Sequence, residues 1–264
     1  MTTSSDVLGE RFAALRAAKR AALIGYVTAG HPTPEESVDV IAAVADAGAD
    51  VLEIGVPFSD PMADGPVIQA SSQRALEHGV TLDRVFDIVQ RARVRVPLVL
   101  FSYLNPLLAA GPDVLRRAAS AGFSGVLVTD LPVGADRERE AWLGEGPLAF
   151  VRLVAPTTPT PRMQEIARHG RGFVYLISRT GVTGMRDQLP DDLAQTVRRL
   201  RDVCPLPIAV GFGIARPDQA AAVARLADGV VVGSALVQAA ADGGARAAAA
   251  LTKSLRAALD SAVA

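Results

Sequence analysis

Cysteine and lysine are scarce in this chain, and each shortage excludes a kind of chemistry. Cys204 is the single cysteine among 264 residues, which excludes an internal disulfide and a cysteine-based metal site within one chain and favours a reducing compartment. The two lysines, Lys19 and Lys253, fall in predicted helices rather than near the end of a predicted strand. A Schiff-base mechanism, which needs a lysine beside the substrate, is therefore not expected.

Histidine is also rare, and its positions argue against a catalytic zinc ion. The three histidines, His31, His78 and His169, are scattered along the chain, whereas a zinc site gathers several such ligands. We expect His78 and His169 to be ordinary surface or helix-capping residues, while His31 alone lies on a loop that follows a predicted strand. We therefore expect no metal and no cofactor, and carboxylates remain as the candidate proton-transfer groups.

The chain lacks long charged blocks and long apolar runs. Its formal net charge is -1 at pH 7, and without clustered basic residues we expect neither nucleic acid nor an anionic membrane as its main partner. No apolar run reaches the ~18 residues of a membrane span, and residues 1–20 lack the apolar core and cleavage site of a signal peptide. We expect a cytoplasmic protein that acts on a small molecule.

Short apolar runs rich in β-branched residues repeat along the chain and predict its fold. Eight such runs alternate with segments of helical spacing, which is the pattern of a parallel sheet closed into a (β/α)8 TIM barrel of the α/β class. We expect a single TIM-barrel domain over residues 1–264, with an extra N-terminal helix near residues 6–19. The predicted strands cover residues 22–27, 51–54, 98–101, 125–128, 148–153, 173–177, 207–210 and 229–232.

The segments between these runs are predicted to be helices. Their starts carry capping and proline signals, as at Thr33-Pro34, at Thr81 and at Arg216-Pro217-Asp218. The predicted helices cover residues 37–47, 82–93, 114–121, 163–168, 193–203 and 219–226, followed by a short helix over 234–239 and a closing helix over 245–259.

Glu53 is a charged residue inside one of these apolar runs. Alternation along the strand places it with Val51 and Gly55 on the face opposite Leu52 and Ile54. Its carboxyl points into the barrel or beneath the helices, both apolar places where an unpaired carboxylate raises its pKa and holds a proton. A glutamate near the carboxyl end of a barrel strand is thus a candidate acid-base group. The alternative is that Glu53 pairs with an arginine or a backbone donor and only fixes packing.

The loop after this strand favours the catalytic interpretation. It carries three prolines and two aspartates, Asp60 and Asp64, so it is rigid enough to hold these carboxylates over the barrel mouth. Taken alone, each aspartate is better explained by turn formation or capping.

Glycine-rich segments follow the last three predicted strands. They are Gly181-Val182-Thr183-Gly184, Gly211-Phe212-Gly213 and Gly233-Ser234. Glycine lets backbone N–H groups approach an anion, and the loops after the last two strands of TIM barrels recurrently bind phosphate together with the start of a short helix. The predicted helix over 234–239 would offer such a start. One of these glycines alone would indicate only a tight turn, but three groups at consecutive strand ends predict a phosphate site.

The acidic strand and its loop resemble the signature of the tryptophan synthase alpha-subunit family. The similar stretch is Leu52-Glu53-Ile54-Gly55-Val56-Pro57-Phe58-Ser59-Asp60-Pro61, continued by Asp64-Gly65-Pro66. The resemblance covers nearly the whole chain, with further similar segments at Ser102-Tyr103-Leu104-Asn105-Pro106, Asp130-Leu131-Pro132, Ala155-Pro156-Thr157-Thr158-Pro159, residues 175–184, and Gly211-Phe212-Gly213-Ile214.

The resemblance implies an activity and a partner. The activity is that of a lyase that cleaves indole-3-glycerol phosphate to indole and D-glyceraldehyde 3-phosphate in tryptophan biosynthesis. The partner is a pyridoxal-phosphate-dependent beta subunit in an α2β2 heterotetramer.

The resemblance also assigns roles to individual residues. It implies that Glu53 and Asp64 are the catalytic carboxylates. The substrate-binding residues are Thr183, Gly184, Gly213, Gly233 and Ser234 near the phosphate, and Tyr26, Phe101, Tyr103, Leu127, Tyr175 and Phe212 around the indole ring. Family members usually carry phenylalanine at the position of Tyr26, leucine or methionine near Phe101, and aspartate at His31. These departures leave the chemistry intact and leave the shape of the pocket open.

Three other interpretations stay open at this point. A phosphosugar isomerase or a prenyl-phosphate transferase would share the glycine-rich phosphate site, although such enzymes do not require the stretch from Glu53 to Asp64. A non-catalytic barrel that regulates another enzyme is a second possibility, against which the intact pair of carboxylates argues. A stand-alone indole-releasing lyase is a third, and only co-purification with a partner would separate it from a subunit.

Overall fold

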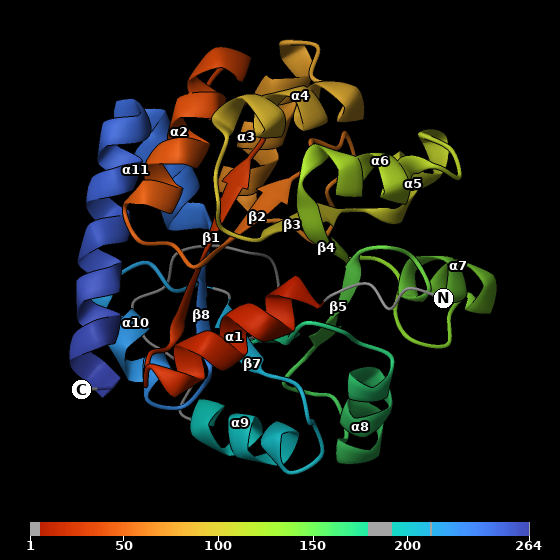
Figure 1. The fold of residues 1–264 in the computed structure, drawn as a ribbon, viewed down its shortest axis with the longest axis vertical. Coiled ribbons are helices and arrows are strands. Elements are labelled where there is room, and N and C mark those ends of the chain that lie inside the picture. The colour runs from red at the N-terminus through yellow and green to blue at the C-terminus, as the bar shows by residue number, and fades with distance from the viewer. Residues whose placement is uncertain (1–5, 179–191, 212, 264) are drawn as a thin grey trace.

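Eight parallel strands form a closed barrel in the computed structural model, which describes residues 6–178, 192–211 and 213–263 (Figure 1). Each strand pairs with the next along the chain, and β1 also pairs with β8, so the sheet has no free edge. This confirms the predicted TIM barrel. The strands are β1 (Ala22–Thr28), β2 (Val51–Gly55), β3 (Leu98–Ser102), β4 (Phe123–Val128), β5 (Ala149–Val154), β6 (Val174–Ile177), β7 (Ile208–Gly211) and β8 (Gly229–Val232).

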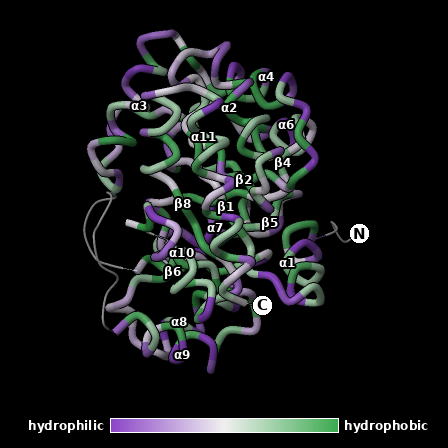
Figure 2. Tube along the Cα trace, turned by 90° about the vertical axis from the view of Figure 1, so that its left-hand side faces the viewer, coloured by the Kyte–Doolittle hydropathy of each residue, from purple (hydrophilic) through white to green (hydrophobic). Residues whose placement is uncertain are grey.

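Helices surround the barrel and cover the outer face of the sheet. Hydrophobic residues lie along the strands, and hydrophilic residues gather at helix ends and outer turns (Figure 2). The helices are α1 (Val7–Ala17), α2 (Pro34–Asp46), α3 (Pro66–Glu77), α4 (Leu82–Ala92), α5 (Leu104–Ala109), α6 (Val114–Ala121), α7 (Arg137–Gly144), α8 (Thr160–Arg168), α9 (Leu193–Arg201), α10 (Pro217–Ala224) and α11 (Ser234–Val263). That residues 1–264 form one domain stays a prediction.

Side chains alternate between two cores along each strand. Leu52 and Ile54 of β2 pack under the helices, whereas Val51 packs inside the barrel with residues such as Val99 and Leu127. Because successive strand residues face opposite ways, Glu53 must share the inner face with Val51. The sequence left two directions open for Glu53, and the structure selects the barrel interior.

The extra helix α1 packs against the N-terminal end of the barrel. Its buried residues Leu8 and Phe12 belong to the inner core, and the Phe12 ring lies 5.3 Å from that of Phe173. Asp6 caps the helix by accepting a hydrogen bond from Gly9 N–H at 3.0 Å, and it also accepts one from Gly172 N–H at 3.1 Å. The helix is thereby tied to the segment that enters β6.

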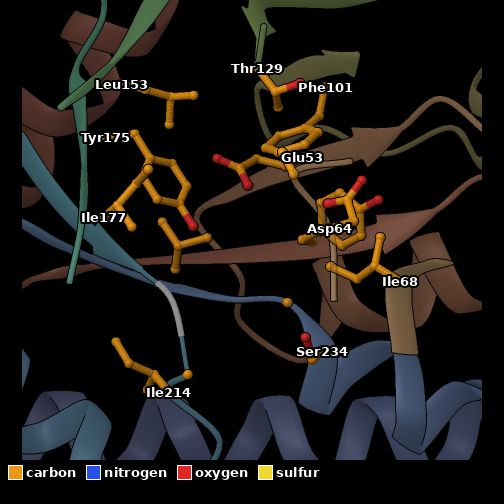
Figure 3. Close-up of a pocket in the computed structure, with 15 residues that line it drawn as sticks. Glu53, Asp64, Ile68, Phe101, Thr129, Leu153, Tyr175, Ile177, Ile214 and Ser234 are labelled. Atoms are coloured by element: carbon orange, nitrogen blue, oxygen red, sulfur yellow. The ribbon is translucent and has the colours of Figure 1, made fainter. Parts of the chain in front are cut away.

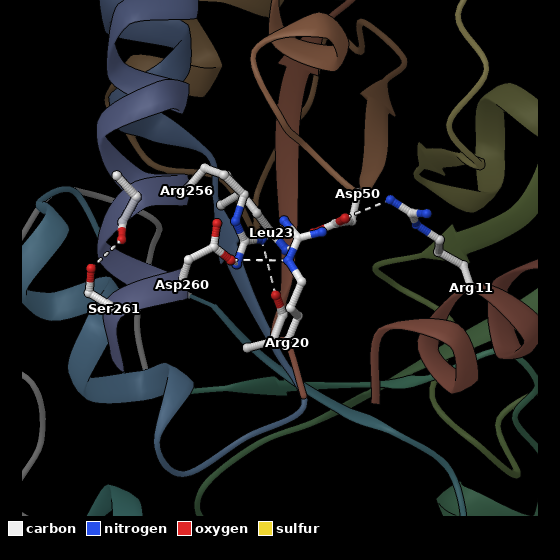
Figure 4. A network of polar contacts seen from close by, with 9 residues as sticks. Arg11, Arg20, Leu23, Asp50, Arg256, Asp260 and Ser261 are labelled. Carbon is white, nitrogen blue, oxygen red and sulfur yellow. Dashed lines mark hydrogen bonds and ion pairs between the residues drawn. The ribbon is translucent and has the colours of Figure 1, made fainter. Parts of the chain in front are cut away.

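A network of ion pairs around a buried carboxylate stabilises the N-terminal end of the barrel (Figure 4). Asp50, directly before β2, accepts hydrogen bonds from Arg256 at 2.9 Å, from Arg11 at 2.6 Å and from Leu23 N–H at 2.9 Å. Arg256 comes from α11, Arg11 from α1 and Leu23 from β1. One carboxylate therefore joins elements from the beginning and the end of the chain.

Three helices were not predicted from the sequence, and α11 is longer than either helix predicted there. The helix α3 has few apolar residues, α5 spans only six residues, and α7 is largely charged, so none shows a long apolar stripe. Non-helical backbone at Gly243 and Gly244 interrupts α11. The interruption separates the two helices that the sequence predicts over 234–239 and 245–259.

Candidate active site

Glu53 lies inside the barrel without a charged partner. It is 1% exposed, and its Oε1 atom is buried with no hydrogen-bond partner among the residues that the structure describes. Burial raises the pKa of the Glu53 carboxyl to about 8, because water no longer stabilises its charge. The alternative in which Glu53 pairs with an arginine has no support within the described part of the chain, where no ion pair to it is found.

Asp64 lies on the loop between β2 and α3 and is buried although its neighbours Ala63 and Pro66 are exposed. Its Oδ2 accepts a hydrogen bond of 2.9 Å from the Tyr103 hydroxyl. Burial raises the pKa of Asp64 to about 6, and the Tyr103 hydrogen bond opposes that rise. Gln69 of α3 donates to the Asp64 carbonyl oxygen at 2.8 Å, so the backbone of the residue is also held.

The two carboxyl groups face one cavity at the carboxyl ends of the strands (Figure 3). Its volume is about 740 Å³, including the part open to solvent. Apart from the carboxyl groups its wall is mostly apolar. The cavity is lined by Tyr26, Glu53, Ala63, Asp64, Ile68, Phe101, Thr129, Leu153, Tyr175, Ile177, Gly213, Ile214, Val231, Gly233 and Ser234. An apolar cavity with a few convergent polar groups is the usual form of a small-molecule site.

Aromatic rings form part of this wall. The rings of Tyr26 and Phe101 meet edge to face, with centroids 5.2 Å apart and planes at 79°. The Tyr26 hydroxyl lies against the Cα of Gly55, where an added Cβ would stand only 2.0 Å from it. Tyr175 is placed in the same way against Gly211, at 2.1 Å. The missing side chains of these two glycines therefore make room for the tyrosines inside the barrel.

The other end of the cavity is suited to an anion. Gly213, Gly233 and Ser234 line it, and α11 begins at Ser234. The first N–H groups of a helix have no partners within the helix and carry its positive dipole end. Gly213 has a φ of +85°, a left-handed conformation that favours glycine. This geometry agrees with the predicted phosphate site, although Thr183, Gly184 and Phe212 lie outside the described residues.

The cavity wall includes most, but not all, of the predicted site residues that are described. Leu127 and Tyr103 are absent from the wall. Leu127 is fully buried inside the barrel, and the Tyr103 hydroxyl is bonded to the Asp64 carboxyl group. Sequence reasoning missed several wall residues, namely Ala63, Ile68, Thr129, Leu153, Ile177, Ile214 and Val231. The strand period could have found some of them, because Ile177 lies two residues after Tyr175 and Val231 two residues before Gly233, on the same inner face.

Two further features bear on the expectations from the sequence. Within the described ranges, no three His, Cys, Asp or Glu side chains lie close enough together to hold a metal ion. None of the helices described combines the length and apolar character needed to cross a membrane.

The fold and this cavity define a TIM-barrel enzyme with a pair of buried carboxyl groups and a glycine-lined helix start at the carboxyl ends of its strands. Residues 12–262 match the family model described as tryptophan synthase alpha chain. The chain belongs to this family. Its members are lyases that catalyse the alpha reaction of tryptophan biosynthesis, the cleavage of indole-3-glycerol phosphate.

Individual relatives are similar over most of their length. The tryptophan synthase alpha chain of Gluconacetobacter diazotrophicus is 49% identical, with 87% of this chain and 85% of the relative covered. That of Geobacter sulfurreducens is 47% identical, with 86% and 87% covered.

Solved structures agree with these relatives. A structure of Mycobacterium tuberculosis tryptophan synthase has a TM-score of 0.88 at 38% identity and covers 96% of this chain and 97% of its own. Tryptophan synthase subunit alpha from Legionella pneumophila has a TM-score of 0.87 at 35% identity, with 97% and 98% covered.

Proposed function

We propose that the chain cleaves indole-3-glycerol phosphate with Glu53 and Asp64 as its acid-base pair. The bond that breaks joins C3 of the indole ring to the glycerol chain. Protonated Glu53 gives a proton to C3 while ionised Asp64 takes the proton of the indole N–H. The Glu53 carboxylate then takes the proton of the neighbouring hydroxyl as the bond breaks and the aldehyde forms, and Asp64 returns its proton to the ring nitrogen.

The observation that carries this proposal is the pair of carboxyl groups on one apolar cavity, with pKa values raised to about 8 for Glu53 and about 6 for Asp64. Near neutral pH, one group is then mostly protonated and the other mostly ionised. A reaction that needs an acid at one atom and a base at another is served by two groups whose surroundings separate their pKa values.

The shape of the cavity supports one orientation of the substrate. The indole ring would lie among the aromatic and aliphatic residues Tyr26, Phe101 and Leu153, and the phosphate would lie at Gly213, Gly233 and the start of α11. Binding energy from the phosphate would then position the reacting carbon between the carboxyl groups.

Amide variants of the two carboxylates test the proposal. General acid-base groups supply ~10²- to 10⁴-fold in rate, so Glu53→Gln and Asp64→Asn should each lower kcat by about that factor and change substrate affinity little. The matched control is Asp60→Asn in the isolated chain, because Asp60 is an exposed aspartate of the same loop. Indole release, substrate binding and thermal midpoint are measured for each. A kcat within about threefold of the parent in either folded variant removes that residue from the mechanism.

We propose further that the chain works in the cytoplasm with a pyridoxal-phosphate-dependent beta subunit, in an α2β2 complex that consumes the released indole. Exposed apolar side chains at the barrel mouth support a docking face there: Met62, on the β2–α3 loop, is 79% exposed, and Leu108 of α5 is 38% exposed. The isolated chain is mixed with a beta subunit, and complex mass and indole release are followed. An absence of both binding and stimulation would leave the chain as a stand-alone lyase.

A further inference from the structure

Tyr103 contacts the loop that carries Asp64 through both its hydroxyl group and its ring. The hydroxyl donates to Asp64 Oδ2 at 2.9 Å and accepts a hydrogen bond from Ala63 N–H at 2.9 Å. Tyr103 is itself 4% exposed, and its ring packs on that of Phe58, in the same loop, with centroids 5.0 Å apart. A single side chain from outside the loop thus holds the loop at three residues.

We infer that Tyr103 is a positioning residue, which fixes both the place and the ionised state of the Asp64 carboxylate. This inference rests on the proposed role of Asp64 and differs from the sequence expectation, in which Tyr103 borders the indole ring. The Tyr103 hydroxyl is already bonded to Asp64 and to Ala63 N–H. We therefore place its effect on the reaction through Asp64.

The hydroxyl can serve Asp64 across the working pH range because it does not itself titrate there. Burial, with Asp64 nearby as a smaller cause, raises the pKa of Tyr103 above its ordinary value. A hydroxyl that keeps its proton favours the charged form of the carboxylate to which it donates. Without that donor, the buried Asp64 would hold its proton to a higher pH and would fail as a base at neutral pH.

Tyr103 is anchored well enough to impose this geometry. It stands at the junction between β3 and α5, where the Leu104 N–H donates to Asp130 at 2.8 Å. The Ser102 hydroxyl donates to the Tyr103 carbonyl oxygen at 2.8 Å. The phenol thus reaches the loop from a backbone that is fixed on both sides of its own residue.

Tyr103→Phe tests the inference because it keeps the ring on Phe58 and removes only the hydroxyl. A hydrogen bond to a charged group is typically worth enough to move a pKa by about one unit. We expect the acid limb of the kcat/KM profile to move up by about one pH unit, so that activity falls ~10-fold below that limb and much less above it. The phenols of Tyr26 and Tyr175 also lie near Asp64, so the control is taken away from the cavity. Thr252→Val removes another buried hydroxyl, one that donates to the Ala248 carbonyl oxygen within α11, and should leave the limb in place.

Two further measurements separate the possible outcomes. Carbon-13 NMR of labelled aspartate carboxyls, with the Asp64 signal assigned by its loss in Asp64→Asn, should show the same upward shift in Tyr103→Phe without reference to activity. In the Asp64→Asn background, Tyr103→Phe should have almost no additional effect on kcat, because residues that act through one another are not additive.

A role for Tyr103 in packing alone would lower activity equally at all pH values and leave the Asp64 titration unchanged, and either result overturns the inference. If Asp64→Asn itself keeps its activity, the proposed function fails instead.

Should Tyr103→Phe not fold, all three tyrosines of the chain can be replaced by 3-fluorotyrosine. That phenol is a stronger donor and should move the limb the opposite way; an unmoved limb in the folded protein again counts against the inference.

Discussion

Glu53 and Asp64 hold their protons to different pH values because their surroundings differ. Glu53 is 1% exposed, its Oε1 atom has no hydrogen-bond partner among the described residues, and burial raises its pKa to about 8. Asp64, in contrast, has a hydroxyl donor and a pKa of about 6. The proposed mechanism needs Asp64 ionised and Glu53 protonated. Activity should therefore rise as the pH passes about 6 and fall as it passes about 8.

The measurement is kcat/KM for indole release between pH 5 and pH 9.5, which reports the free enzyme. A substrate phosphate also titrates near pH ~6, so the acid limb is compared with the titration of the substrate alone. Activity that continues to rise above pH 9 would contradict the requirement for a protonated Glu53.

The same burial predicts how stability depends on pH. The pKa of Glu53 is raised from an ordinary 4.5 to about 8, so between these values the folded state binds more protons than the unfolded state. The contribution of Glu53 to the free energy of unfolding is then fully present below about pH 4.5 and is lost as the pH rises through about 8. Glu53→Gln cannot ionise, so it should exceed the parent in free energy of unfolding by on the order of 2 kcal/mol at high pH.

Urea unfolding of both proteins at pH 5.5 and pH 8.5 checks this expectation. The advantage of Glu53→Gln should be large at the higher pH and small at the lower one. If Glu53→Gln exceeds the parent in free energy of unfolding by the same amount at pH 5.5 and pH 8.5, the Glu53 carboxylate has a partner in solution and its ionisation does not destabilise the fold.

Residues such as Glu53 could be predicted because a charge inside an apolar strand stands out in the sequence. Thr129 and Tyr103 could not be assigned in this way. The role of Tyr103 depends on its contact with Asp64, which lies 39 positions away along the chain, and such contacts exist only once the loops have been placed in space. Single polar residues at strand ends carry no such information by themselves.

At the scale of elements, the start of α11 is the part of the anion site that is easiest to test. An added Cβ at Gly233 would meet Tyr26 at 3.6 Å, an ordinary contact, so Gly233→Val should fold while placing methyl groups where the phosphate is expected. We expect KM to rise at least about tenfold with a smaller change in kcat, as for the loss of binding that ground state and transition state share.

The control for this change is Gly144→Val, because Gly144 ends α7 and has open space around it. Steady-state kinetics with inorganic phosphate as a competitive inhibitor give a second measure, since its inhibition constant should rise in parallel with KM. An unchanged KM and an unchanged inhibition constant in Gly233→Val would reject the start of α11 as the phosphate site.

Elements were predictable from the sequence where burial imposes a pattern. All eight strands appear within two residues of the ranges expected at each end, because strands covered on both faces read as continuous apolar runs. The helices α3, α5 and α7 lack that pattern: α3 has few apolar residues, α5 spans only six residues, and α7 begins with the charged segment Arg137-Glu138-Arg139-Glu140. Helices held by tertiary contacts rather than by an apolar stripe leave a weak mark on the sequence.

At the scale of the whole molecule, the two ends of the barrel have different tasks. The carboxyl ends of the strands carry the cavity with Glu53 and Asp64. The opposite end carries the Asp50 network, which joins α1, β1 and α11. In TIM barrels chemistry belongs to the first of these ends and stability to the second. Substitutions at the two ends should therefore separate activity from stability.

Asp50→Asn tests this division. Asp50 is 2% exposed and faces Arg256, itself 7% exposed, so its neutral replacement leaves the buried guanidinium with the more exposed Asp260 as its remaining counter-charge. Breaking a buried pair in this way costs about 3–5 kcal/mol, which for a chain of this size lowers the thermal midpoint by on the order of 10 °C. The kcat and KM of the folded variant should match those of the parent.

The control is Asp260→Asn, because Asp260 also binds Arg256, at 2.6 Å, but has a side chain that is 44% exposed, and exposed pairs contribute about 0–1 kcal/mol. Thermal unfolding and indole release are measured on the same preparations. If Asp50→Asn has a lower kcat than the parent at temperatures where it is still folded, the two ends of the barrel are coupled. If its thermal midpoint is unchanged, the Asp50 network does not stabilise the fold.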